Sequence, residues 1–351
     1  MTAEMTETTR TGRADGDRPS DEEFPRLADP YRRELFAHCY RMVGSVHDAE
    51  DLVQETYLRA WKAYDGFEGR SSLRTWLHRI ATNVCLTSLE GAERRPLPTG
   101  LGAPGSKAGE PLVRSDEVRW LEPVPEALVS DGTLSAPAHT DPAEQAAQRD
   151  TVRLAFVAAL QHLPPRQRAV LILRDVLAWR AGEVAEALGL STAAVNSVLQ
   201  RARDRLDKVQ PRADSTAARV DEDHRELLER YVDAFWRKDI EAIVALLKED
   251  AVWEMPPYLG WYQGADNIGR LIDTQCPGGV HDMPMLPTTA NGQPAFGLYM
   301  RRPGGREFTP FHLQVLTLTD GRVSHVAAFF DAALFELFGL PAVVREEDLA
   351  R

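Results

Sequence analysis

The chain has 351 residues, of which 43% are hydrophobic, and a formal net charge of −12. It is too long for one ordinary domain, so two or three domains are expected. No apolar run approaches the ~20 residues that cross a bilayer, which argues against a membrane protein. The three cysteines, Cys39, Cys85 and Cys276, lie far apart and form no C-x-x-C pair. We therefore expect buried thiols and neither a metal site nor a cofactor.

The acidity is unevenly distributed. Residues 1–25 are polar and acidic and contain no apolar segment, so we expect a disordered tail and not a signal peptide, in a cytoplasmic protein. Residues 146–210 carry ten Lys and Arg against six Asp and Glu, a net charge of +4. Residues 221–351 carry twelve against twenty-one, a net charge of −9. Because DNA binding needs only a local basic patch, the overall charge does not exclude it.

Composition also predicts the domain organisation. Residues 26–96 and 146–210 are dense in helix formers with apolar residues at helical spacing. Residues 97–145 are rich in Pro, Gly and Ser without helical or strand periodicity, which is typical of an inter-domain linker. In residues 221–341 helices are followed by strands, and Asp320-Gly321 between two strand-like segments predicts a β-hairpin. The predicted fold class is two all-α domains followed by an α+β domain.

The first helical segment contains two amphipathic helices. The predicted helix over residues 48–64 has a charged face that, taken alone, is best read as a solvated surface. On the next helix, residues 73–84, the predicted core side chains are Leu73, Trp76, Leu77, Ile80 and Val84. The opposite face is predicted to carry Arg74, Thr75, His78, Arg79 and Thr82, with Asn83 at its edge. Cations, hydroxyls and an amide on one face suit phosphates and unpaired base edges.

The run HCYRMVGSVHDAEDLVQETYLRAWKAYDGF followed by SSLRTWLHRIATNVC resembles region 2 of the extracytoplasmic-function (ECF) sigma factors. In that family the first helix docks on the coiled coil of the polymerase β′ subunit. The resemblance assigns this role to Asp48, Asp51, Leu52, Gln54 and Glu55. The second helix and the loop before it open and read the −10 element, a role that falls on Phe67, Arg70, Ser71, Arg74, Arg79 and Asn83. Trp76 matches the same set but faces the predicted core.

The second helical segment contains AGEVAEALGLSTAAV, which has helix-turn-helix spacing. In this motif Ala185 is small where two helices cross, Gly189 turns the chain and Val195 packs in the core. A plain amphipathic helical hairpin is the alternative interpretation. The segment resembles region 4 of the same sigma class, which reads the −35 element and contacts the polymerase β flap. We expect DNA contacts from Thr192, Ala193, Asn196, Ser197, Gln200, Arg201 and Arg203. The arginines suit phosphates, and the others reach base edges.

The last third of the chain resembles the SnoaL-like branch of the NTF2-like fold, a cone of helices and curved antiparallel sheet around a cavity. Side chains expected at the cavity are Trp253, Met255, Trp261, Tyr299, His312, His325 and Phe329, with Glu254, Tyr258 and Asp331 as further candidates. Some relatives of this fold are isomerases or cyclases, and His312 or Asp331 would then be the base. A lone His on a strand is more often structural.

We interpret the chain as a sigma factor that binds core RNA polymerase and promoter DNA and catalyses no reaction. The C-terminal domain is expected to modulate its activity, with a small-molecule ligand as a candidate further partner and no membrane association. The alternative is a SnoaL-like isomerase or cyclase fused to a DNA-binding module. The region 2 resemblance favours the sigma factor, because a simple DNA-binding module needs no polymerase-docking helix.

Overall fold

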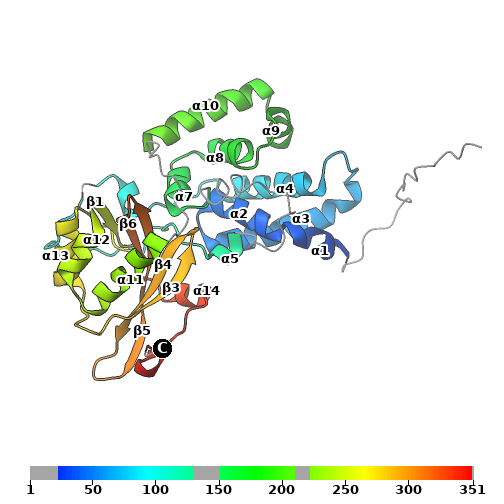
Figure 1. The fold of residues 1–351 in the computed structure, drawn as a ribbon. Coiled ribbons are helices and arrows are strands. Elements are labelled where there is room, and N and C mark those ends of the chain that lie inside the picture. The colour runs from blue at the N-terminus through cyan, green and yellow to red at the C-terminus, as the bar shows by residue number, and fades with distance from the viewer. Residues whose placement is uncertain (1–22, 104, 130–150, 210–221, 350–351) are drawn as a thin grey trace, which may run out of the picture.

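A computed structural model describes residues 23–103, 105–129, 151–209 and 222–349 of the chain. Two helical domains lie against each other, and an α+β domain lies against both at one end (Figure 1). The expected acidic tail falls outside the described residues except for residues 23–25, and so do residues 130–145 of the expected linker.

The first helical domain packs three main helices around one core. These are α2 (Arg32–Val43), α3 (Val46–Ala63) and α4 (Leu73–Ser88), preceded by the short α1 (Glu23–Ala28). Gly44, with a φ of 71°, ends α2 in the left-handed conformation that glycine tolerates best. The hydroxyls of Ser45 and Ser72 accept backbone hydrogen bonds from the first turns of α3 and α4. Local capping therefore sets where these helices begin.

The second helical domain contains α7 (Leu154–Gln161), α8 (Pro165–Leu171), α9 (Ala181–Leu188) and α10 (Thr192–Val209). The predicted helix-turn-helix is confirmed. Ala185 and Val195 are buried, and Gly189 joins α9 to α10 with a φ of 63°. The Ser191 hydroxyl accepts from the backbone N–H of Ala194 and so caps α10.

The C-terminal domain combines α11 (Glu222–Trp236), α12 (Ile240–Leu246) and α13 (Ala265–Gln275) with a seven-stranded sheet. Its strands are β1 (Leu247–Glu254), β2 (Trp261–Gln263), β3 (Met285–Ala290), β4 (Gln293–Arg301), β5 (Glu307–Thr319), β6 (Arg322–Phe329) and β7 (Val344–Arg345). The order is β2-β1-β6-β5-β4-β3, with β7 beside β5, and only β1 and β6 run parallel. The predicted hairpin at Asp320-Gly321 is confirmed, with φ values of 54° and 67°.

The two faces of this sheet have different partners. Side chains such as Leu316, Val326 and Ala328 share a core with α11, α12 and α13. Side chains on the opposite face of the same strands, including Leu313 and Phe329, belong to one buried cluster with the cores of both helical domains. Since successive side chains of a strand point to opposite faces, one sheet supports two cores. The α+β domain is thus docked on the helical domains through an apolar face.

The first part of the expected linker is packed and not free. Leu121 and Val124 are completely buried against the helical domains, and α5 (Glu126–Val129) contacts α2. Earlier in the linker, the Ser106 N–H donates to the carbonyl of Trp261 in the C-terminal domain over 2.6 Å. The segment therefore packs against both the C-terminal domain and the first helical domain, because its few apolar side chains are buried in their cores.

Asn291 connects all of these parts. It lies completely buried in the β3–β4 turn, where its φ of 55° is one that asparagine tolerates better than most residues. Its side-chain N–H donates to the Tyr40 hydroxyl of α2 and to the Val152 carbonyl before α7, over 2.9 and 2.8 Å. Its side-chain oxygen accepts from the Val124 N–H of the linker at 3.0 Å. One amide thus bonds to three separate segments.

We predict that Asn291→Gly lowers the free energy of unfolding by about 2–5 kcal/mol, since it leaves buried partner groups without hydrogen bonds. Glycine keeps the left-handed turn, so the change isolates the amide. Asp320→Gly is the matched control, because Asp320 occupies the same turn position of the β5–β6 hairpin but is exposed. Urea unfolding should show an effect of about 1 kcal/mol or less for the control. Equal losses from both variants would contradict the role of Asn291.

Candidate nucleic-acid and polymerase interface

The outer face of α3 presents most of the residues predicted to bind polymerase. Asp51 and Gln54 are exposed, and Glu55 is half-exposed and ion-paired with Arg59 over 2.6 Å. Leu52 is instead only 7% exposed and packs in the core beneath this face. Leu58 was not among the predicted residues, although it is 52% exposed. Its position four residues after Gln54 was the available signal, since residues at that spacing share a helix face.

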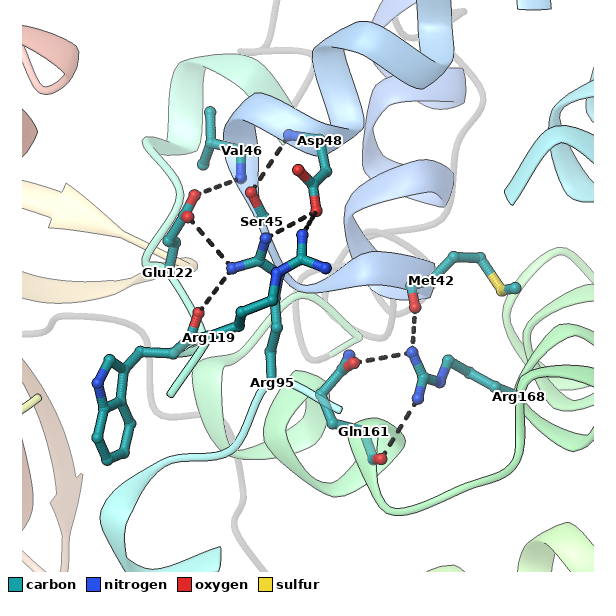
Figure 2. A network of polar contacts seen from close by, with 10 residues as sticks. Met42, Ser45, Val46, Asp48, Arg95, Arg119, Glu122, Gln161 and Arg168 are labelled. Atoms are coloured by element: carbon teal, nitrogen blue, oxygen red, sulfur yellow. Dashed lines mark hydrogen bonds and ion pairs between the residues drawn. The ribbon is translucent and has the colours of Figure 1, made fainter. Parts of the chain in front are cut away.

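Asp48, at the start of α3, is engaged by the linker (Figure 2). Its carboxylate accepts from Arg95 at 2.7 Å and from Arg119 at 3.0 Å. Arg95 also lies 3.6 Å from a Glu122 carboxylate oxygen, while the other oxygen of Glu122 accepts from the Val46 N–H at 2.8 Å. The first turn of α3 is thus bound by Arg95, at the end of its own domain, and by Arg119 and Glu122 of the linker. No local pattern in the sequence marks this contact.

The residues predicted to read the −10 element lie on α4 and the loop before it. Arg70, Ser71, Arg74, Arg79 and Asn83 are exposed, and Phe67 is half-buried with its ring 4.8 Å from that of Trp76. The predicted exposure of His78 and Thr82 is wrong, because both are buried. The Thr82 hydroxyl contacts His38 of α2, and the His78 ring meets Trp179 of the second helical domain. A neighbouring helix of the same domain thus contacts Thr82 and the second domain contacts His78, and a helical wheel reveals neither.

The two most prominent cations of α4 are paired with carboxylates of the same chain. Arg74 donates to Glu34 of α2, with 2.8 Å between Nε and one carboxylate oxygen. Arg79 reaches Glu186 of α9, at 3.4 Å between the guanidinium and the carboxylate. The second contact joins the helix predicted to read the −10 element to the helix-turn-helix. Pairs this exposed contribute little stability, about 0–1 kcal/mol each, so they are readily exchanged for other partners.

The exposed face of α10 contains all seven residues predicted to contact the −35 element. Val195, Leu199 and Ala202 are buried on the opposite side. Arg203 forms a bidentate ion pair with Asp175, with distances of 2.9 and 2.7 Å. Gln200 donates to Asp204 at 2.7 Å. The N-terminal half of the face, from Thr192 to Ser197, is therefore the part most open to base edges.

The residues expected to line a cavity in the C-terminal domain do not meet at one place. Trp253 and Met255 belong to the core under the three helices, and His312 points to the same side of the sheet, next to Gln314. Phe329 belongs to the core shared with the helical domains. Tyr299 packs on Phe335 in a third cluster. An irregularity in the β4–β5 register between Leu298 and Tyr299 separates it from the first group.

The remaining cavity candidates contact the linker. Trp261 of β2 donates from its indole N–H to the Ala103 carbonyl over 3.0 Å. His325 lies 2.7 Å from a carboxylate oxygen of Glu254, which is 1% exposed. The other oxygen of Glu254 accepts from the Thr99 N–H at 2.8 Å. The paired acid and imidazole therefore anchor the linker to the sheet.

Neither candidate catalytic base has the properties of one. Burial lowers the pKa of His312 to about 3, so its imidazole is neutral and a poor proton acceptor near pH 7. Asp331 is exposed outside the sheet. Among the described residues, no cluster of three or more His, Cys, Asp or Glu side chains is arranged to hold a metal ion. No described helix is both long and apolar enough to span a membrane.

Three protein families match the chain. Sigma-70 region 2 matches residues 27–95, Sigma-70 region 4 matches residues 153–206, and the SnoaL-like domain matches residues 228–326. These segments coincide with the first helical domain, the second helical domain and most of the α+β domain.

Two ECF sigma factors of one organism are similar to most of this chain. The ECF RNA polymerase sigma factor SigG of Mycobacterium tuberculosis is 58% identical over 93% of this chain and 87% of its own length. SigJ of the same organism, also an ECF RNA polymerase sigma factor, is 31% identical over 69% of each chain. The crystal structure of SigJ has the same fold, with a TM-score of 0.56 over 90% of this chain and 99% of that one, at 24% identity. The chain belongs to the ECF family of RNA polymerase sigma factors and directs transcription initiation.

Proposed function

We propose that this sigma factor binds core RNA polymerase through the outer face of α3 and reads promoter DNA through α4 and α10. We further propose that the structure is a closed state, which must open before both promoter elements can be read. The observation that carries the second proposal is the 3.4 Å contact between Arg79 of α4 and Glu186 of α9.

The closed state follows from the dimensions of DNA. The −10 and −35 elements are about 25 base pairs apart, which corresponds to about 85 Å of duplex at ~3.4 Å per base pair. Two helices in direct contact do not bridge that distance. The two helical domains must therefore separate on a promoter, which would also release Arg79 for phosphate contacts.

Polymerase docking would compete with the linker for the same surface. On the family resemblance, we assign the β′ coiled coil to α3 and the β flap to the second helical domain. Asp51 is exposed and Glu55 is held only by its exposed pair with Arg59, whereas Asp48 is held by Arg95 and Arg119. Docking that uses Asp48 must first break these two ion pairs. We place this activity in the cytoplasm, where core polymerase and promoter DNA are found.

The C-terminal domain is proposed to modulate activity by stabilising the closed state. Its sheet contributes Leu313 and Phe329 to the core of the helical domains, and Asn291 bonds to α2 and to the segment before α7. These contacts join two domains that the promoter would separate. A ligand that binds one state better than the other would shift the balance between them.

We infer that any small molecule entering the cone would meet two unsatisfied polar groups. The indole N–H of Trp253 and the Nδ1 atom of His312 are buried without a hydrogen-bond partner. The amide nitrogen of Gln314 donates to Nε2 of His312, so the neutral imidazole carries its proton on Nδ1. Buried polar atoms without partners are rare and costly, so a ligand that supplies acceptors to both N–H groups would be stabilised. Such a ligand would be bound and not transformed, since the His312 imidazole is a poor base.

Opening can be measured with two spin labels. Thr87→Cys on α4 and Gly182→Cys on α9 are suitable sites, because Thr87 is exposed and a Cβ on Gly182 meets no neighbouring atom. Cys276→Ser leaves only the buried native thiols. We expect a short inter-label distance in the free protein and an increase of tens of Å, toward the ~85 Å element spacing, with core polymerase and a promoter.

A label pair at Thr87 and Lys62, both exposed within the first helical domain, is the control and should keep its distance. If the α4–α9 distance stays short in a complex that initiates transcription, the closed-state proposal is wrong.

The polymerase-docking face can be tested by charge reversal. Asp51→Lys combined with Glu55→Lys should weaken binding to core polymerase about tenfold or more, because both side chains point away from the core. Reversing the exposed Glu226 and Glu229 of α11 is the matched control and should leave core binding unchanged. Titration of labelled sigma factor with core polymerase gives both affinities. Undiminished binding by the α3 variant would remove this face from the docking surface.

Base reading and phosphate contact predict different effects on α10. Asn196→Ala should cost about 1–3 kcal/mol at one base pair of the −35 element and little elsewhere. Arg203→Ala should weaken binding to all sequences alike and reduce the salt dependence, because a phosphate contact carries no sequence information. Holoenzyme binding to a promoter library at several salt concentrations separates the two. A uniform loss from Asn196→Ala would place that residue in the phosphate class instead.

A further inference from the structure

A small pocket lies where the first helical domain, the linker and the second helical domain meet. Its volume is about 110 Å³, several times the ~10–15 Å³ that one water molecule needs. It is lined by residues of α2, α3 and the segment after α4, by Arg119 of the linker, and by the stretch from Gln161 to Arg168 around the α7–α8 turn. Figure 2 shows the polar contacts around it.

Four of the lining side chains are arginines. They are Arg94, Arg95, Arg119 and Arg168. The carboxylates in the lining are Asp48 and Glu93, so the lining carries two more positive than negative charges. Arg95 and Arg119 share Asp48, and Arg95 also approaches Glu122. Arg94 and Arg168, by contrast, contact no described carboxylate.

Arg168 is buried without a carboxylate. It is 3% exposed, and its guanidinium donates only to neutral acceptors, namely the Met42, Gln161 and Leu163 carbonyls and the Gln161 side-chain oxygen. Its Nε has no hydrogen-bond partner. Burial lowers the pKa of Arg168 to about 10. A buried charge without a counter-charge is costly, so an anion beside it would be strongly favoured.

Arg94 adds a second cation without a carboxylate partner among the described residues. One of its guanidinium nitrogens lies 2.8 Å from Nδ1 of His162, and another donates to the Gly100 carbonyl at 2.6 Å. Burial lowers the pKa of His162, and the charges of Arg94, Arg205 and Arg168 lower it further. The region is therefore electropositive even though the chain as a whole is acidic.

We propose that this pocket binds the phosphate group of a small molecule. Arginine N–H groups are strong donors to phosphate oxygens. Arg168 has its Nε–H left to donate, Arg94 has N–H groups beyond its two contacts, and neither contacts a described carboxylate. The size of the pocket admits a phosphate group but not a nucleic-acid duplex. The phosphate would be held between guanidinium groups from the segment after α4, the linker and α8. Arg95 and Arg119 would turn toward it from Asp48.

Phosphate binding would stabilise the closed state. The lining comes from both helical domains and the linker, so the pocket exists only while they are together. A ligand that binds one state shifts the equilibrium toward that state. This consequence rests on the closed state proposed above, whereas the binding itself does not.

Calorimetry of the full chain with inorganic phosphate tests the binding directly. We expect saturable binding to one site, which chloride at matched ionic strength does not reproduce. Pyrophosphate and ATP form further arms, and tighter binding of either would identify a longer phosphate chain or a nucleotide as the source of the phosphate. Absence of saturable binding in all three arms would overturn the proposal.

Two variants test where the phosphate binds. Arg94→Ala should weaken binding about tenfold or more through loss of a charge-assisted contact, and Arg168→Lys should weaken it while keeping the buried charge. Arg114→Ala is the matched control, because Arg114 is an exposed linker arginine paired with Asp116 and lies outside the pocket lining. Equal binding by Arg94→Ala and the control would show an adventitious ion only and overturn the proposal.

The regulatory consequence needs a separate readout. Phosphate should lower the affinity of the parent protein for core polymerase and have little effect on Arg94→Ala. If spin labels show no opening but phosphate binding still depends on Arg94, the closed-state proposal fails and the pocket stands. If opening occurs and phosphate does not bind, only the phosphate-binding proposal is wrong.

Discussion

The arrangement of this protein depends on the buried amide of Asn291. It bonds to α2, to the linker and to the segment before α7, three parts of the chain far apart in sequence. A buried polar network is favourable only when all of its members are satisfied together. Any movement that separates one partner leaves the others unsatisfied, so the network favours a single docked arrangement of the domains over intermediate ones.

Elsewhere on the chain, carboxylates form ion pairs with arginines for which we propose DNA contacts. Arg74, Arg79 and Arg203 each contact an acidic residue. Asp48 is conversely held by two arginines, Arg95 after α4 and Arg119 of the linker. Exposed ion pairs are weak individually, so they do not prevent opening by themselves. The stronger restraint is the apolar face of the sheet, which opening would expose to water.

Features that depend on near neighbours in the chain were predictable from sequence. The helix-turn-helix follows from Ala185, Gly189 and Val195, and the β5–β6 hairpin follows from Asp320-Gly321, because caps and tight turns are set within a few residues. The same signal, Asn291-Gly292, also marks the β3–β4 hairpin, although the pattern gives no hint that its asparagine is buried. The two regions of the sigma family were likewise recognisable from contiguous motifs.

What the sequence determined by itself was therefore the fold class and many of the outward-facing residues, including all seven on the exposed face of α10. Only the tertiary structure decided how the domains meet: His78 and Thr82 became buried, Asp48 gained linker partners, and the cavity candidates separated onto different faces of one sheet. Helical and strand periodicity shows which side of an element is apolar, but not which surface will cover it. That depends on contacts between residues far apart in the sequence, such as Thr82 and His38 at 44 positions and Asp48 and Arg119 at 71, which leave no local pattern.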